Sequence, residues 1–187
     1  AADVNVTYDG KAHSISVNND IAGAAVYYGA TALNAENYNT SGNTANPGYT
    51  EAGSYTVFYF VMKPNYTAVS GSAKITVSKA GQTVHVGGIT AEYDGTAHAA
   101  SAEATGITTG AATGSSITYE YYKGSVTAGN KLTGAPVYAG IYTVKATAGE
   151  TGDYNSASAE AEITVTARPI TISAGSATKV YDGNSLT

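Results

Sequence analysis

The sequence contains no cysteine and no tryptophan, and only 12% of its 187 residues are charged. Without cysteine, the chain can form neither a disulfide nor a thiolate metal site. Its formal net charge of -5 disfavours nucleic acid as a partner, because nucleic acid binds basic surfaces. No run of about 18 apolar residues is present, so we expect no membrane insertion in this part of the chain.

The sequence also lacks the motifs that carry common enzyme chemistry. Gly-x-Ser-x-Gly, His-Glu-x-x-His and a phosphate-binding glycine loop are all missing. The few carboxylates are scattered, so no pair can be nominated for glycoside hydrolysis. We therefore expect a protein that is not an enzyme and that needs no cofactor.

Small and β-forming residues take the place of the missing types, with 22 glycines and 16 tyrosines among them. Such a composition favours short strands and tight turns over long helices. Four landmarks then recur in one order, which indicates a duplication. They are Tyr-Asp-Gly at 8–10 and 93–95, Gly-x-Tyr-Thr-Val at 53–57 and 140–144, Asx-Tyr at 65–66 and 153–154, and Ile-Thr-Val at 75–77 and 163–165.

The repeat divides the chain into two units and the start of a third. The first unit covers residues 1–78, the second covers 79–167, and residues 168–187 contain the opening strands of a truncated third repeat. The first unit lacks the counterpart of the strand expected at 82–86. We therefore expect the chain to be a piece of a longer tandem array, cut out of phase with its domains.

Alternating strands at short spacing predict the fold. About seven short strands in each unit favour a sandwich. A glycine, then a tyrosine one residue later, then an alternating strand is typical of a tyrosine corner, in which the hydroxyl of Tyr55 or Tyr142 would bond backbone just upstream. We predict an all-β chain of tandem immunoglobulin-like antiparallel β-sandwiches, with a β-grasp-like fold as the second choice.

These motifs resemble the MBG and YDG-type repeat domains of large bacterial surface proteins, which are related to bacterial Ig-like repeats. The resemblance covers both units and the partial third, and it is most specific over residues 168–183. It implies tandem extracellular modules of secreted, adhesin-like proteins at the bacterial cell surface. It implies no catalytic residues.

Two Asp-His pairs invite comparison with a metal site: Asp9 with His13, and Asp94 with His98. In the third repeat Leu186 stands where the histidines stand. An aliphatic replacement favours side-chain packing over metal binding. The simplest role of the aspartates is to form turns. We therefore expect no metal site. Whether Lys145 forms an isopeptide cross-link is left open by the sequence.

The corner strand of the first unit is apolar on both faces, since Phe58, Phe60 and Met62 alternate with an inward-facing set. An outward apolar stripe requires a cover. The loop at 29–46, another domain or protomer, or a host ligand could each supply it. The residues of this candidate partner surface, together with tyrosines that could stack on a glycan, are Phe58, Phe60, Met62, Tyr27, Tyr28, Tyr121 and Tyr122.

The tail is expected to find a partner, because a half-domain cannot bury its own apolar side chains. We expect residues 170–173 or 178–181 to add to a sheet edge. One acceptor would be the first unit of a second copy, through strand exchange over residues 170–181.

The leading functional hypothesis is a non-catalytic repeat module of a secreted bacterial surface protein, acting as a stalk or spacer and offering an adhesion surface. Its partners would be neighbouring repeats of the same chain and a host glycan or matrix protein. The alternative is a glycan- or protein-binding domain that uses exposed tyrosines.

Overall fold

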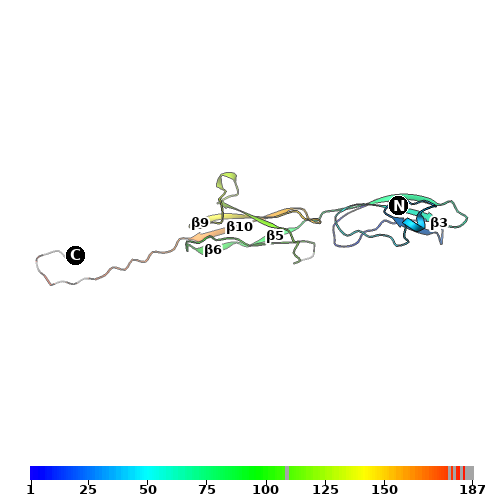
Figure 1. The fold of residues 1–187 in the computed structure, drawn as a ribbon. Helices are drawn as coiled ribbons and strands as arrows, with labels where there is room; N and C mark the ends of the chain where they lie inside the picture. The colour runs from blue at the N-terminus through cyan, green and yellow to red at the C-terminus, as the bar shows by residue number, and fades with distance from the viewer. Residues whose placement is uncertain (108–109, 177, 179, 182, 184–187) are drawn as a thin grey trace.

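The computed structural model describes residues 1–107, 110–176, 178, 180, 181 and 183. The molecule is elongated, with two β bodies end to end and an extended C-terminal tail (Figure 1). Within the described residues, no helix has both the length and the apolar character needed to cross a membrane.

The first unit forms one four-stranded sheet in the order β1-β4-β3-β2. Its strands are β1 (Val4–Thr7), β2 (Ala25–Gly29), β3 (Gly53–Met62) and β4 (Val69–Ser78), with the short helix α1 (Tyr38–Ser41) between β2 and β3. β1 runs parallel to β4, and the other pairs are antiparallel.

The second unit repeats this sheet in the order β6-β10-β9-β8 and adds a two-stranded β5-β7 sheet. Its strands are β5 (Thr83–Val86), β6 (Ile89–Glu92), β7 (Ala102–Thr105), β8 (Ile117–Lys123), β9 (Gly140–Ala148) and β10 (Ala157–Thr166), with a 3-10 turn η1 (Ala128–Asn130). β6 runs parallel to β10. The all-β, Ig-like sandwich prediction is confirmed, except that each four-stranded sheet contains one parallel pair. Parallel neighbours need a long crossover, which here passes through the other layer.

The two sheets of the second unit pack face to face. Val84 of β5 and Ala104 of β7 lie against Ala146 and Ala148 of β9, and all four are buried. Along β9 every second side chain from Tyr142 to Ala148 is buried, which confirms the alternation read from the sequence. This part of the core therefore sits between a four-stranded and a two-stranded layer.

The second layer of the first unit is made of loops. Ile15 is only 2% exposed, yet the residues around it form no ladder and meet the opposite loop through one bridge, His13 with Tyr49. The expectation of about seven strands is therefore wrong for this unit, which has four. Residues 17–20, which correspond to β7 in the repeat, form no ladder.

The loop at 29–46 covers part of the apolar stripe on β3. The ring of Tyr38 in α1 stacks on Phe60 with centroids 5.3 Å apart, and it meets Tyr27 edge-on at 4.8 Å. Phe60 is 5% exposed, and Phe58 and Met62 are half-buried. Of the three covers considered, the loop is the one that lies on Phe60.

The tail from residue 167 to 176 is extended and forms no strand with either unit. Ile170 and Ile172 are both 89% exposed. The expectation that the tail adds to a sheet edge is therefore wrong within this chain, because none of the described tail residues pairs with an edge strand of either unit. In 178–181 only Thr178, Val180 and Tyr181 are described, and Leu186 lies outside the described residues.

Candidate functional site

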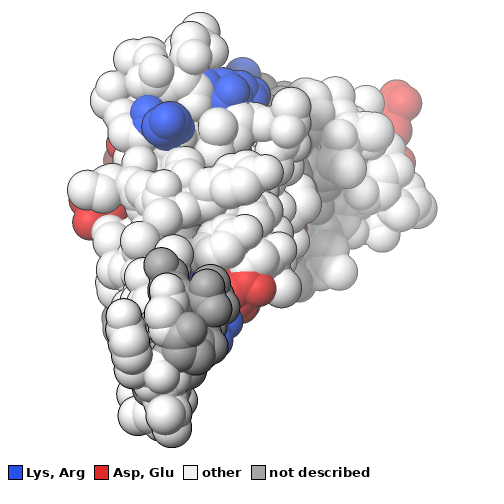
Figure 2. Space-filling view, turned by 90° about the vertical axis from the view of Figure 1, so that its left-hand side faces the viewer, with Lys and Arg blue, Asp and Glu red and all other residues white. Residues whose placement is uncertain are grey.

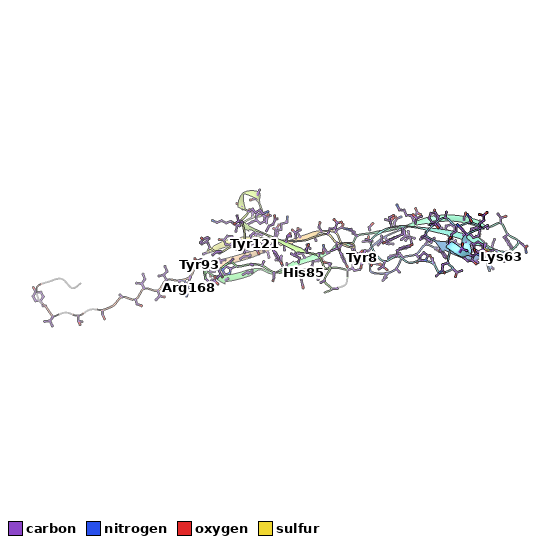
Figure 3. The ribbon with its side chains drawn as sticks, viewed as in Figure 1. Tyr8, Lys63, His85, Tyr93, Tyr121 and Arg168 are labelled. Atoms are coloured by element: carbon purple, nitrogen blue, oxygen red, sulfur yellow. The ribbon has the colours of Figure 1, made fainter. Side chains whose placement is uncertain are left out.

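The two units meet at a joint built from the landmarks of the repeat. Tyr8 ends the β1 ladder by donating its backbone N–H to Ser78 O at 2.8 Å. Its ring meets Tyr154 of the second unit edge to face, with centroids 5.5 Å apart and planes at 82°. Figure 3 shows Tyr8 where the two bodies meet. The Tyr-Asp-Gly turn of one unit thus contacts the Asp-Tyr turn of the next.

A hydrogen bond crosses the joint beside these rings. The backbone N–H of Ala52 donates to Asp153 Oδ1 at 2.7 Å, over a separation of 101 residues. The neighbouring Glu51 shares a hydrogen bond with Asp153, and this bond together with the negative charge of Asp153 raises the pKa of Glu51. Burial first, and then the charge of Asp153, raises the pKa of Tyr8. One carboxylate therefore organises the polar part of the joint.

The linker between the units is bonded to the second unit along its length. Ala80 donates its N–H to Asp153 O and accepts one from Asn155, at 2.8 and 2.9 Å. Lys79 forms an ion pair with Glu150. Buried Gln82 donates its side-chain amide to Gly149 O and Asn155 O at 2.9 and 2.8 Å. A linker held in this way has little freedom to swing.

The tyrosine corner places the joint residues. Tyr55 donates its hydroxyl to Glu51 O at 3.0 Å, and Tyr142 donates to Tyr138 O at 2.8 Å. A Cβ on Gly53 would come within 2.8 Å of the Tyr55 hydroxyl oxygen, so only glycine fits beneath the ring. The first corner thereby fixes the backbone of Glu51, next to the Ala52 N–H that Asp153 accepts.

The second unit carries the same corner at the far end of the molecule, where no unit is docked. Tyr138 is 72% exposed there, and Tyr93 is 37% exposed. Both line an apolar cavity of about 470 Å³, together with Ala139 and residues 167–170. Figure 3 shows Tyr93 and Arg168 at this end and Lys63 at the opposite end. Figure 2, which looks along the molecule from the tail side, shows isolated charged groups on a largely uncharged face.

The tyrosines considered for glycan stacking are packed. Tyr121 and Tyr122 are 8% and 6% exposed. The hydroxyl of Tyr121 accepts the Ala100 N–H at 3.1 Å, and that of Tyr122 donates to Glu120 at 3.0 Å. Tyr27 and Tyr28 are half-buried. The expectation of an exposed stacking pair is wrong for Tyr121 and Tyr122, since their rings are needed to fill the core.

The Asp-His pairs close their turns. Asp9 accepts the Lys11 N–H at 2.9 Å and lies 2.8 Å from His13 Nε2, and these contacts lower the pKa of Asp9 in that order. Asp94 bonds Thr96 instead, and His98 stands 3.7 Å away. Over the described ranges, no three or more His, Cys, Asp or Glu residues gather into a metal-binding group.

Lys145 lies across from two carboxylates. Its register partners on either side of β9 are Glu120 of β8 and Glu160 of β10. Alternating charges across neighbouring strands stabilise a sheet modestly. No asparagine faces Lys145 in these ladders.

The residues of the joint belong to the repeated sequence motifs, but the motifs alone did not show that these residues contact each other. Tyr8, Asp153 and Tyr154 were recognisable only as repeated motifs. The signal that could have located the joint is their position, because Tyr-Asp-Gly follows a strand at one end of the unit and Asx-Tyr precedes the last strand at the other. Gln82 and Lys79 carried no signal.

No protein-family model matches the chain, and no curated protein matches it either. Among solved structures, it is similar to repeats EC1-3 of Drosophila N-cadherin at 10% identity and a TM-score of 0.34, covering 89% of this chain and 64% of that one. It is also similar to fibronectin(III)-like modules of Clostridium thermocellum CbhA, at 14% identity and 0.31, covering 89% and 91%. A third is a SusE-like surface located polysaccharide binding protein from Bacteroides thetaiotaomicron, at 13% and 0.29, covering 88% and 33%. At these TM-scores the similarities carry no argument about function, which is argued from the chain's own residues.

Proposed function

We propose that this chain is a spacer module of a secreted bacterial surface protein, in which tandem domains form a semi-rigid extracellular stalk. The domains are residues 1–78 and 79–167, and residues 168–187 open a third. Their first partners are the neighbouring repeats of the same chain. The observation that carries the proposal is the joint, where the Ala52–Asp153 hydrogen bond lies beside the Tyr8–Tyr154 ring pair.

Each joint contact is modest, and their combination restrains the angle between units. A hydrogen bond to a charged group contributes about 1.5–3 kcal/mol. An aromatic pair adds about 0.5–1.5 kcal/mol. Because the linker is hydrogen-bonded to the second unit, it leaves less freedom for one unit to rotate against the other. A spacer needs this stiffness, since repeated domains transmit length only when neighbours hold a fixed angle.

An adhesive role is the second part of the proposal, with a host glycan or matrix protein as partner. The tyrosines at 27, 28, 121 and 122 do not favour it, because they are packed. Exposed apolar side chains lie elsewhere, and Tyr66 and Tyr138 are among them. A binding array of glycans and matrix proteins tests this role separately, and a reproducible signal from the full chain would support it.

The spacer role is tested by the orientation of the two units in solution. Residual dipolar couplings and small-angle scattering on the full chain should fit one elongated body with a fixed angle. The double substitution Asp153→Ala with Tyr154→Ala should broaden the distribution of angles while leaving both folds intact. Asp20→Ala, far from the joint, is the matched control. Independent tumbling of the two units in the unmodified chain would overturn the proposal.

A further inference from the structure

We propose that the second unit binds an extended, positively charged segment of another protein, which adds as a strand to the open edge of β10 over residues 158–162. This inference rests on the adhesive part of the proposed function, and it names the site and the class of the partner. It does not require the joint within the chain to be stiff. Residues 79–167 supply every part of the site.

The strand β10 is paired along its whole length on one side and along only part of it on the other. Its ladder with β9 covers residues 157–165, whereas its ladder with β6 starts at Ile163. Ahead of β6, the chain belongs to the other sheet, where β5 pairs with β7. Figure 1 shows β5 and β6 following each other along β10. Among the described residues, the first half of β10 therefore has no neighbour in its own sheet on this side.

The backbone groups on this edge point outward. On the β6 side, Thr166 O accepts the Tyr93 N–H at 2.9 Å. Because backbone groups alternate along a strand, Ser158, Glu160 and Glu162 turn their N–H and C=O groups toward the same side. Over the described residues, the N–H groups of Ser158 and Glu160 have no hydrogen-bond acceptor there. A row of unpaired donors and acceptors is a template for a further strand.

The first unit caps one donor at the equivalent edge. Asp3 Oδ1 accepts the Lys74 N–H at 2.8 Å. In the registers of β1 with β4 and of β6 with β10, Lys74 corresponds to Glu162 and Asp3 corresponds to Gly88. A glycine has no side chain that could accept this bond. The edge of the second unit is therefore open at the position where the first unit closes it.

A cavity of about 740 Å³ lies beside the open edge. Its lining comes from β5 and the glycine after it (84–87), from the start of β7 (101–103) and from β10 (159–160). Val86, Ala102 and Ala159 are half-buried in it, and a Cβ on Gly87 would have open space around it. A strand that adds to β10 could place its inward side chains in this cavity, and small apolar side chains match the lining.

The charge around the cavity selects the partner. Glu103 and Glu160 are exposed members of the lining, and Glu162 follows Glu160 on the same face of β10. His85 is the one lining residue that could carry a positive charge. Lys145 lies opposite Glu160 on the other side, in β9. Opposite charges on neighbouring strands attract, so lysine or arginine at alternate positions of the added strand suits this edge. In such complexes main-chain bonds give affinity and alternate side chains give specificity.

An NMR titration of the full chain with a probe peptide tests the site. The probe is an end-blocked hexapeptide of alternating lysine and valine. It should bind, and the amides of Ser158 and Glu160 should shift and become protected from hydrogen exchange. A hexapeptide of alternating glutamate and valine should bind about tenfold more weakly, because like charges would stand opposite each other. Methylation of the backbone nitrogens of the lysine probe keeps its charge and blocks the ladder, so this peptide should not bind.

Variants of the full chain separate strand addition from charge attraction. Ser158→Pro removes an outward N–H and leaves the bonds to β9, and it should weaken binding of the probe about tenfold. Circular dichroism would verify that it is folded. Glu103→Gln with Glu160→Gln should weaken binding about fivefold, because exposed charge pairs contribute little each. Asp20→Asn with Glu36→Gln removes as many charges from exposed positions of the first unit, and this control should bind the probe unchanged.

Three results would reject the strand site: no binding of the lysine probe to the unmodified chain, amide shifts that avoid the β10 edge, or equal binding of the methylated probe. In the last case, attraction between charges would explain the binding by itself. The adhesive role is judged separately on the binding array. A matrix-protein signal there that survives Ser158→Pro would keep the adhesive role and reject this site.

Discussion

The two units follow one sequence pattern and complete the layer above their four-stranded sheets differently. In the second unit the layer is the β5-β7 sheet, and the positions that face it are alanines at 146, 148 and 157. In the first unit Tyr59, Val61 and Val69 stand at those positions, and the layer is loop around Ile15. Small side chains let two sheets approach closely, whereas large ones reach out to loops that have no ladder of their own.

This difference shows which contacts order the core of each unit. The second unit has a backbone ladder on both sides of its core, so its packing is supported by two sheets. The first unit has a ladder on one side and depends on side chains on the other. On its outer face it again uses a loop, with Tyr38 stacked on Phe60. A loop layer can shift to fill a void more easily than a paired sheet.

The largest expected effect comes from truncating matched core residues. Ile75→Ala and Ile163→Ala each remove a side chain that is 0% exposed. Such changes cost about 2–5 kcal/mol of unfolding free energy. We expect Ile163→Ala to be the more costly, because Val86 of the paired strand β5 packs against the cluster of Ile163, whereas the layer over Ile75 is loop. Urea denaturation of the full chain measures both, with exposed Ile170→Ala as the control that should cost nothing. A larger loss for Ile75→Ala would contradict this account of the two layers.

A smaller effect is expected from the polar anchors of the loops. Gln82 is buried, and its side-chain oxygen accepts hydrogen bonds from Thr113 and Ser115, both at 2.7 Å. Gln82→Ala removes the buried acceptor of both hydroxyls and should cost about 1–3 kcal/mol. In the first unit, Asn46 donates one bond to Ile15 O at 2.6 Å, so Asn46→Ala should cost less. Thermal unfolding of the two variants compares them, and equal losses would argue against a special role for Gln82.

The sequence predicted the features that have a period or a local motif. Burial along residues 142–148 follows an alternation of two, and the corner needs only glycine and tyrosine at fixed spacing. Contacts without such a pattern could not be predicted. The Ala52–Asp153 hydrogen bond spans 101 residues between polar groups, and no periodicity marks either end. The sequence does not separate the loop layer around Ile15 from a strand, because a strand and a buried loop share one alternating pattern.

The two tyrosine corners offer a finer comparison. Tyr142 is 6% exposed, whereas Tyr55 is only half-buried, and both donate to a carbonyl four residues upstream. Tyr→Phe at each position removes one hydrogen bond, worth about 0.5–1.5 kcal/mol. Tyr142→Phe should lie at the upper end, since the carbonyl it leaves is less accessible to water. Denaturant midpoints of the two variants, measured in parallel, decide this. A greater loss for Tyr55→Phe would show that exposure does not control the cost.

The smallest expected effect is a pH dependence of the joint. The far end of the second unit should lack it, because Tyr138 stands there at the position that Glu51 occupies in the first unit. The pKa of Glu51 is raised by its hydrogen bond with Asp153 when the units are joined. A carboxyl whose pKa is raised in the joined state stabilises that state at pH values below its pKa in the separated units, about 4.3. This stabilisation is lost as the pH rises through the raised pKa. The angle between units should therefore be more restricted at mildly acidic pH than at neutral pH, as measured by dipolar couplings. Glu51→Gln keeps a hydrogen-bond donor at every pH and should remove the dependence. A joint that loosens on acidification would show that the charge on Asp153, rather than the shared proton, holds it.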